Sequence, residues 1–386
     1  MARPDYHTPA LAVKVALAHD WLVHLAGSER VLESMHALYP GPIHTLLCDP
    51  AVIRGSVFEA ADIRPSFLQR LPGAVHHHRS LLPLFPLAMA SFDLSGFDLV
   101  LSSSHAAAKS VRTRPGQLHI CYSHTPMRYA WDLLEDYIAP LDPLKRVLAR
   151  RLLLHLRGWD RRTARRVDHF LANSAFTADR IRRCYGRTAT VLHPPVEVER
   201  FRPAARKGRH FVTVSRLVPY KRVDAIVGAF NRLGLPLVVV GHGPERGSLA
   251  AVAGPNVEFA GALDDRAVAA VVAEARGFVI AAVEDFGIAP VEAQAAGTPV
   301  VALGRGGALE TVVDGETGTF FPEQSPEAIA AAVERLLRLE DRIDPARLRA
   351  HAERFSRPRF EQAYRAFVEA RLRDRKSAAQ VPFPPR

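Results

Sequence analysis

The stretch FVIAAVEDFGIAPVEAQAAGTPVVAL, residues 278–303, carries the pattern that decides the fold. It holds two short apolar runs, 278–281 and 300–303, and the segment between them has Pro290 near the start of a helical pattern and Gly297 at its end. Proline suits the first turn of a helix and glycine its C-terminal stop, so the stretch predicts a strand, a helix and a second strand. Two strands joined through a helix pair in parallel, because a parallel pair needs a long crossover connection.

The same alternation runs along the whole chain, twice over. Short apolar runs and helical patterns alternate up to His193-Pro194-Pro195, and after the polar bridge 202–210 they restart with the run Phe211–Val214. Apolar strands between helices are typical of parallel sheets, which bind ligands at the carboxyl ends of their strands. We therefore predict an α/β protein of two domains that face a ligand-binding cleft. The predicted parts are a Rossmann-like doubly wound domain at 1–200, a second one at 208–355, a helix at 356–375 that packs back toward the first domain, and a loose tail at 376–386.

Composition excludes several classes of protein. The 386 residues include 51 lysines and arginines against 40 aspartates and glutamates, a formal charge of +11, and 48% are hydrophobic. That apolar content excludes a largely disordered chain, yet no uninterrupted apolar run reaches the roughly 18 residues of a spanning helix. The first residues lack the apolar core of a secretory signal, and three scattered cysteines favour a reducing compartment. The expected localisation is cytoplasmic.

Common nucleotide-binding and metal-binding motifs are absent from the sequence. There is no GxxxxGK[ST], which argues against a P-loop NTPase, and no GxGxxG after the first strand, which argues against a dinucleotide oxidoreductase. No Asp-x-Asp occurs, and the consecutive side chains of His76, His77 and His78 do not easily share one ion. We therefore expect neither a metal nor a cofactor.

Two glutamates bracket the turn between the first strand and the helix of the opening stretch. We expect Glu284 at a strand end and Glu292 in the first turn of the helix, with the amides of Phe286, Gly287 and Ile288 between them. Unpaired amides at a helix N-terminus receive anionic or hydroxylic groups, so the arrangement suits a polyhydroxylated, phosphorylated ligand. The alternative, in which Glu292 only complements the helix dipole, stays open.

Two cations occupy the corresponding turn of the restarted series. Arg216 and Lys221 follow the strand Phe211–Val214 and lie near a helix N-terminus, where positive charge is unfavourable unless an anion is bound. A bound diphosphate would explain both cations, and the alternative is solvated surface charge. The turn Gly241-His242-Gly243-Pro244 follows another strand and is a weak signal by itself.

These motifs resemble the retaining GT-B glycosyltransferases of family 4. Within that family, the motifs resemble those of bacterial GDP-mannose-dependent mannosyltransferases of surface-polysaccharide assembly. The segments that carry the resemblance are Arg216 with Lys221, Glu284–Glu292 around Phe-Gly-Ile, GGALETV at 306–312, HDWL at 19–22, AGSER at 26–30 and YSHTP at 122–126.

The resemblance implies roles for nine residues. Arg216 and Lys221 would bind the donor's diphosphate and stabilise negative charge as the sugar leaves. Gly27 would let the backbone approach the donor phosphates, although the family usually has a second glycine where this chain has Ala26. The implied catalytic residues are His124, near the reacting centre, and Glu284, and the implied donor-binding residues are Gly27, Arg216, Lys221, Phe286, Gly287, Ile288 and Glu292, with Glu292 on the ribose and Glu284 and the three amides on the sugar.

The resemblance also implies a reaction. A retaining glycosyltransferase would move a hexose, with mannose as the best candidate, from a GDP- or UDP-sugar to a lipid-linked or polysaccharide acceptor, without a metal and by front-face displacement. No residue is evident as the carboxylate nucleophile that a retaining glycosidase uses. Three alternatives stay open: a nucleotide-sugar epimerase or a glycan phosphorylase of the same fold, and a basic nucleic-acid-binding protein. We expect no nucleic acid as partner, because the basic residues lack interleaved aromatic side chains.

The positive charge is concentrated in one segment of the first domain. Residues 145–187, from Lys145 to Arg187, hold 13 basic and three acidic side chains, a net charge of +10. On a helical projection the arginines group on one side, with Leu148, Leu152, Leu156 and Trp159 on another, which predicts a basic amphipathic helix. Such a helix lies on the anionic inner face of the cytoplasmic membrane, or packs its apolar side in the core, and the two interpretations can hold together.

Overall fold

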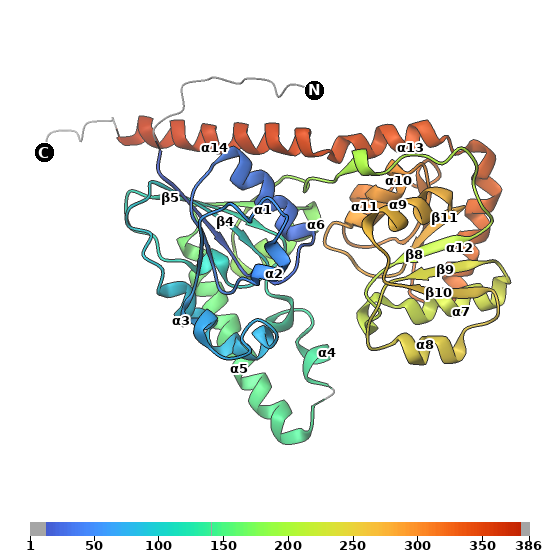
Figure 1. Cartoon of the computed structure of the whole chain (residues 1–386), viewed down its shortest axis with the longest axis horizontal. Helices are drawn as coiled ribbons and strands as arrows, with labels where there is room; N and C mark the ends of the chain where they lie inside the picture. Colours follow the sequence, from blue (N-terminus) through green and yellow to red (C-terminus); the bar gives the residue numbers. More distant parts are fainter. Residues whose placement is uncertain (1–12, 140, 380–386) are drawn as a thin grey trace, which may run out of the picture. The chain divides into compact units, whose positions relative to one another are not determined.

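The computed structural model describes residues 13–139 and 141–379, which form two compact units, each built around one parallel sheet (Figure 1). The first unit comprises the described residues from 13 to 173, 177–192 and the chain from Glu361 on, and the second comprises 174–176 and 193–360.

The division between the units falls at His193, whereas the sequence predicts it between residues 200 and 208. Three apolar residues soon after His193 are buried in the core of the second unit, namely Val196, Val198 and Phe201. The polar bridge therefore lies inside the second unit, because the chain begins its apolar contacts with that unit before the polar run starts.

The sheet of the first unit has seven strands among the described residues. In sheet order they are β3 (Ile63–Pro65), β2 (Ile43–Thr45), β1 (Val15–His19), β4 (Leu99–Ser104), β5 (Leu118–Ser123), β6 (His169–Ala172) and β7 (Ala189–Val191). Every residue of β1, β4 and β5 is buried, as expected for the central strands of a parallel sheet covered on both faces. The helices of this part of the chain are α1 (Gly27–Leu38), α2 (Pro50–Ile53), α3 (Phe85–Ala90), α4 (Leu134–Ile138), α5 (Pro143–Thr163) and α6 (Ala175–Tyr185).

The sheet of the second unit has six strands in the described chain. In sheet order they are β10 (Val257–Gly261), β9 (Leu237–Val240), β8 (Phe211–Val214), β11 (Gly277–Ile280), β12 (Val300–Leu303) and β13 (Gly318–Phe321). The helices are α7 (Val223–Leu233), α8 (Arg246–Val252), α9 (Asp265–Glu274), α10 (Ile288–Ala295), α11 (Ala308–Thr311), α12 (Pro326–Leu339) and α13 (Pro345–Ala352).

In both sheets the order in which the chain adds strands reverses at an equivalent point. In the first, β1 lies between β2 and β4, and in the second, β8 lies between β9 and β11, with every pairing parallel. This is the doubly wound order of the Rossmann fold, whose ligands bind at the carboxyl ends of the strands where the order reverses. The loops after β1, β4, β8 and β11 are therefore the places to look for a site.

Helix α14 (Arg357–Ala379) ends the described chain, and its residues from Glu361 on belong to the first unit. The buried side chains Phe360, Tyr364 and Val368 recur every four residues, so they share one face of the helix. Tyr364 packs against Tyr39 with the ring centroids 6.2 Å apart. The helix runs four residues into the predicted loose tail of 376–386, whose remainder lies outside the described residues.

Candidate active site

The loop after β8 presents Arg216. The Leu217 side chain is fully buried and anchors the loop, whereas the Arg216 side chain is exposed and has no partner among the described residues. The turn after β9 supports this loop: a Cβ would lie 1.9 Å from the Ser215 carbonyl oxygen if built at Gly241, and 2.2 Å from that of Leu217 if built at Gly243. Close backbone contact therefore requires both glycines, and the short GxG motif fixes the loop that carries Arg216.

Lys221 and Glu284 meet where the strand order of the second sheet reverses. The Lys221 ammonium lies 2.5 Å from Glu284 Oε1, and each side chain is 20% exposed. Lys221 ends the short turn Pro219–Lys221, and Arg222 follows it with a left-handed backbone, φ 53°. That conformation is uncommon for a residue with a side chain and costs on the order of 1 kcal/mol, so the loop holds backbone strain beside the ion pair.

The loop between β11 and α10 presents backbone amides. Phe286 anchors it, because its buried ring packs against His193 and Phe355, with centroids 5.5 and 5.4 Å away. Gly287 has φ 92°, a conformation that glycine adopts at little cost. Over the described chain, no group accepts a hydrogen bond from the amides of Phe286, Gly287 or Ile288, the residue that begins α10. The loop thus offers three free donors at a helix N-terminus.

Two further glycines hold this loop from the turn after β12. The Gly307 amide donates to the Glu284 carbonyl oxygen at 2.8 Å. A Cβ at Gly307 would lie 2.4 Å from Phe286 Cα, and one at Gly306 would lie 2.5 Å from the Glu284 carbonyl oxygen. The Gly-Gly pair of the GGALETV motif therefore allows backbone to pack on backbone behind the free amides.

Glu310, in the same motif, is a structural carboxylate. It accepts the amides of Ala175 and Phe176 at 2.9 and 3.3 Å and lies 3.0 Å from His193 Nε2. Burial alone would raise the pKa of Glu310, but the hydrogen bonds from His193 and the two amides outweigh burial and hold the pKa below its usual value.

Glu292 lies deeper in its helix than the sequence predicts. Because α10 begins at Ile288, Glu292 is its fifth residue and belongs to the second turn, not the first, so the prediction was wrong on this point. Its Oε1 lies 3.1 Å from Arg200 Nη2, and the same guanidinium lies 2.5 Å from Asp265 Oδ2. Sequence reasoning missed Arg200, which no motif marks, and the structure places it as the cation that faces Glu292.

In the first unit, the end of β1 and the start of α1 share a buried polar cluster. His19 Nδ1 lies 3.2 Å from the Ser103 carbonyl oxygen, and His19 Nε2 lies 3.2 Å from Glu29 Oε1. Glu29 also accepts the Ala26 amide at 2.8 Å. Burial would raise the pKa of Glu29, but the hydrogen bond and charge of His19 outweigh it and lower the pKa to about 2. The charged carboxylate therefore fixes the turn in which Gly27 opens α1.

Asp20 fixes the segment after β4. Its buried carboxylate accepts four backbone amides, those of residues 105–108, at 2.5–2.9 Å. Burial would raise the pKa of Asp20, but the nearby His105 and His19 and the amide hydrogen bonds outweigh it and hold the pKa below its usual value. These bonds commit Asp20 to positioning the loop that begins with His105.

His124 follows β5 and is half-buried beside this cluster. Its Nε2 lies 2.8 Å from Ser103 Oγ, and its ring packs 5.1 Å from the Tyr122 ring. Removal from water, with additional repulsion from His105 and His19, lowers the pKa of His124 to about 3. Near pH 7 the imidazole is therefore neutral, suited to a hydrogen bond with a hydroxyl group and unsuited to donating a proton as a strong acid.

The buried His119 on β5 makes stability depend on pH. Burial lowers its pKa to about 4, whereas in the unfolded chain a histidine titrates near 6.5. Below pH 6.5 the unfolded state therefore binds a proton at His119 that the folded state does not bind. The contribution of His119 to the free energy of unfolding is complete above pH 6.5 and is lost as the pH falls toward 4. We expect the free energy of unfolding to fall by up to about 1.4 kcal/mol per pH unit on account of His119.

Urea unfolding between pH 7.5 and 4.5 measures this dependence. His119→Gln, which keeps a polar partner for Ser102, is expected to flatten the slope, since Ser102 Oγ lies 2.8 Å from His119 Nε2. The exposed His77→Gln change serves as the matched control and should leave the slope as it is. Equal slopes in the His119 variant and the parent protein would contradict the assignment.

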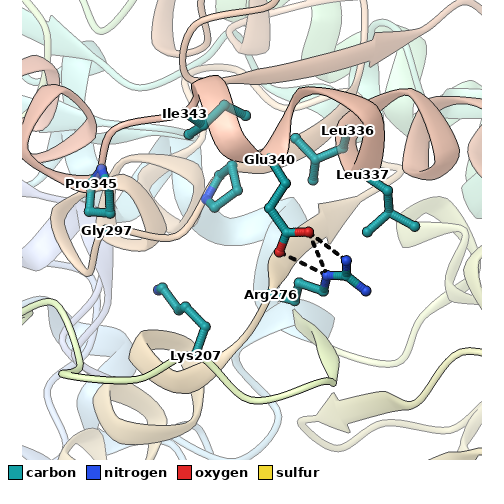
Figure 2. Close-up of a pocket in the computed structure, with 9 residues that line it drawn as sticks. Lys207, Arg276, Gly297, Leu336, Leu337, Glu340, Ile343 and Pro345 are labelled. Carbon is teal, nitrogen blue, oxygen red and sulfur yellow. Dashed lines mark hydrogen bonds and ion pairs between the residues drawn. The ribbon is translucent and has the colours of Figure 1, made fainter.

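A cavity of about 180 Å³ lies on another part of the second unit, and Figure 2 shows its lining. The ion pair of Arg276 with Glu340 forms one side, with shortest distance 2.5 Å. The Lys207 ammonium donates to the Ala273 carbonyl oxygen at 2.6 Å and to Thr298 Oγ1 at 2.7 Å. The cations that line the cavity are thus paired with protein groups, and none of the sequence-predicted donor residues lines the cavity.

Neither a metal-binding cluster nor a helix able to span a membrane occurs among the described residues. Within residues 13–139 and 141–379, no three or more His, Cys, Asp and Glu side chains are grouped to hold a metal ion. Of the three consecutive histidines, His78 packs its ring 5.2 Å from Trp21. Over the same ranges, no helix has both the length and the apolar character to cross a bilayer.

Two protein-family models match the chain. The model described as glycosyl transferases group 1 matches residues 196–355, and glycosyltransferase family 4 matches residues 49–200. The matches overlap at residues 196–200, and together they run through most of both units.

Solved structures of glycosyltransferases share the fold. The structure of HepE of Anabaena in complex with UDP and glucose has a TM-score of 0.66 at 17% identity, and the alignment covers 92% of this chain and 99% of HepE. Sucrose-phosphate synthase of Thermosynechococcus elongatus has a TM-score of 0.67 at 19% identity, over 95% and 100% of the two chains. The protein is thus an α/β protein of GT-B architecture. The chain belongs to the family 4 glycosyltransferases.

Curated relatives include a GDP-mannose-dependent alpha-(1-6)-phosphatidylinositol monomannoside mannosyltransferase. The Mycobacterium tuberculosis H37Rv protein is 34% identical over 201 residues, which are 44% of this chain and 52% of the relative. The Mycolicibacterium smegmatis protein of the same name is 32% identical over 259 residues, which are 55% of this chain and 66% of the relative. The chain thus matches between half and two thirds of the length of these relatives.

Proposed function

We propose that the protein transfers a hexose from a nucleoside diphosphate sugar with retention of configuration, and that the second unit binds the donor. One observation carries this proposal: a guanidinium group and three backbone amides without protein partners in the described chain lie at the carboxyl ends of the strands of the second sheet. Arg216 has no partner in the described chain, and the amides of 286–288 donate to no protein group. A diphosphate with a sugar supplies the negative charge for the guanidinium and the oxygen acceptors for the amides.

The Lys221–Glu284 ion pair provides the polar groups beside those donors. In the proposed complex the ammonium shifts toward the diphosphate and stabilises the charge that develops as the glycosidic bond breaks. Glu284, freed from the ammonium, accepts hydrogen bonds from sugar hydroxyls. Glu292 with Arg200 is assigned to the ribose end of the nucleotide, where a carboxylate held by a cation accepts hydroxyl hydrogen bonds in a fixed orientation. No metal or cofactor is assigned to the reaction.

We assign the first unit to the acceptor. Gly27 is the one donor-binding residue assigned to this unit: it opens α1 beside the buried Glu29, so the turn has a fixed backbone that can approach a donor phosphate closely. His124, neutral near pH 7, is assigned to a hydrogen bond with a sugar hydroxyl at the reacting centre. The leaving diphosphate is the base that takes the acceptor proton in this scheme, which agrees with the lowered pKa of His124.

For the donor and the acceptor, we propose GDP-mannose and a lipid-linked glycan. The support comes from the mycobacterial relatives, whose name includes GDP-mannose as donor and a phosphatidylinositol mannoside as acceptor. We further propose that the protein works in the cytoplasm, on the inner face of the cytoplasmic membrane. The basic segment Lys145–Arg187 supports that placement, because anionic lipids attract clustered cations.

A donor screen tests the proposal. Purified protein is incubated with GDP-mannose, GDP-glucose, UDP-glucose and UDP-galactose and a membrane lipid extract as acceptor, and release of nucleoside diphosphate is measured. We expect release from GDP-mannose above the other donors. Release from a UDP-sugar alone would contradict the assigned donor, and release from none of them would contradict the assigned reaction.

A further inference from the structure

Helix α5 exposes four large apolar side chains, three of them in its first two turns. Leu144 is 71% exposed, Val147 51%, Leu148 58% and Leu154 47%. Positions 144, 147, 148 and 154 follow the spacing of one helix face, since residues three and four apart lie above one another. Four exposed aliphatic side chains on one face of a helix are more than scattered surface residues explain.

The sequence groups Leu148 with Leu152, Leu156 and Trp159 and leaves open whether that side faces a membrane or the core. In the structure Leu156 is buried in the core cluster and Leu152 and Trp159 pack against it, whereas Leu148 is exposed. The buried side chains of α5 all belong to its second half, namely Leu153, Leu156, Asp160 and Thr163. Full burial begins only at Leu153, and Leu144, Val147 and Leu148 are left to solvent.

Cations are interleaved with the exposed apolar side chains. Arg151 lies four residues after Val147 and three after Leu148, so it shares their face, and it has no partner among the described residues. Arg161 and Arg162 are likewise exposed and unpaired over the described ranges. Other arginines of the segment are committed to the protein: Arg157 Nε donates to the Ala130 carbonyl oxygen at 2.6 Å.

We propose that the first half of α5 inserts its exposed leucines and valine into the interfacial region of an anionic lipid bilayer, with Arg151, Arg161 and Arg162 on the lipid phosphates. The inference rests on the proposed function only in placing the protein at a membrane. A helix with aliphatic side chains among unpaired cations matches the layered chemistry of that interface, in which acyl chains lie beneath anionic head groups. A second copy of the chain is a poorer occupant, because it would bring the same cations against this face.

Vesicle cosedimentation tests the inference, with phosphatidylcholine vesicles that contain or lack phosphatidylglycerol. The full chain is expected to bind the anionic vesicles and to bind neutral vesicles at least roughly ten-fold more weakly. The double change Leu144→Ser and Leu148→Ser should weaken binding to anionic vesicles by roughly ten-fold or more, because it removes apolar surface that enters the bilayer. The double change Arg151→Gln and Arg162→Gln should weaken binding and reduce its sensitivity to salt.

The matched control is Val252→Ser at the end of α8, where an equally exposed valine, 62% accessible, is removed without unpaired cations on its face. It should bind vesicles as the parent protein does. Equal vesicle binding by the Leu144/Leu148 variant and the parent would overturn the inference, as would a parent protein that binds neither vesicle. A change of oligomeric state in that variant by analytical ultracentrifugation would assign the face to a second copy instead. Calorimetry of GDP binding without lipid separates failure of the membrane inference from failure of the proposed function, because GDP binding depends on the donor residues alone.

Discussion

Lys221→Ala is expected to lower kcat/KM for sugar transfer by roughly 10²–10³-fold. The ammonium lies 2.5 Å from Glu284 at the point where ligands bind in doubly wound sheets, and its charge is assigned to the departing diphosphate. A cation that stabilises charge developing in the transition state contributes to kcat, so the loss should appear mainly in kcat. Nucleoside diphosphate release at varied donor concentration measures both constants.

The control for this change is Arg232→Ala on α7. Arg232 is also a cation of the second unit paired with a carboxylate, that of Glu327, but the pair is 60% exposed on the surface. Its removal should change activity less than about two-fold, because an exposed pair contributes little. If Lys221→Ala behaved like the control, Lys221 would have no part in the reaction. Glu284→Gln tests the other member, and the double variant should lose less than the product of the two single losses, since the residues act on one ligand.

Asp160→Ala is expected to destabilise the folded protein by about 3–5 kcal/mol. The carboxylate is fully buried on α5 and forms an ion pair with Lys109, and it accepts hydrogen bonds from Trp131 Nε1 at 2.9 Å and Tyr185 Oη at 2.8 Å. Alanine would leave a buried ammonium and two buried donors without their acceptor, and each carries a large desolvation cost. Urea unfolding at pH 7.5 measures the change.

Two further variants identify the cause of that loss. The double change Lys109→Met and Asp160→Leu removes both charges and should recover part of the stability, because no unpaired charge remains buried. Asp179→Ala is the matched control, since this aspartate pairs with Arg182 and Arg183 on the surface, and it should cost less than about 1 kcal/mol. A full-size loss in the Lys109/Asp160 double variant would show that packing, and not charge, is what the single change disrupts.

The sequence predicts the central strands well, because their residues are buried on both faces. The run 300–303 became β12 and the run Phe211–Val214 became β8, each with the same bounds. At one side of the first sheet, β2 and the edge strand β3 escaped prediction, since each has three residues and β3 has no fully buried position. A three-residue strand is too short to show a period, and its place in the sheet depends on its partner.

In the candidate site, too, the sequence predicts the features that depend on local structure and misses those that depend on the fold. The placement of Glu284 and of the three amides follows from one strand–turn–helix, so local pattern predicts it. The pairing of Lys221 with Glu284 joins residues 63 positions apart, and only the strand order of the sheet brings them together. Arg200 belongs to no motif, and only the fold brings it against Glu292.

The boundary errors have a physical origin too. The sequence predicts Glu292 in the first turn because Pro290 suits that turn, but α10 begins two residues before the proline, at Ile288. The first turn still contains Pro290, yet Glu292 falls beyond it. Helix ends depend on hydrogen bonds and dihedral angles that sequence alone leaves uncertain by a few residues.

The configuration of the product tests the account most directly. Enzymatic product made from GDP-α-mannose would be isolated, and the one-bond C1–H1 coupling at the new anomeric centre measured by NMR. Retention, seen as an α-mannoside, is the predicted result. A β-mannoside would show inversion and would contradict the assignment of the protein to retaining sugar transfer at the edge of the second sheet.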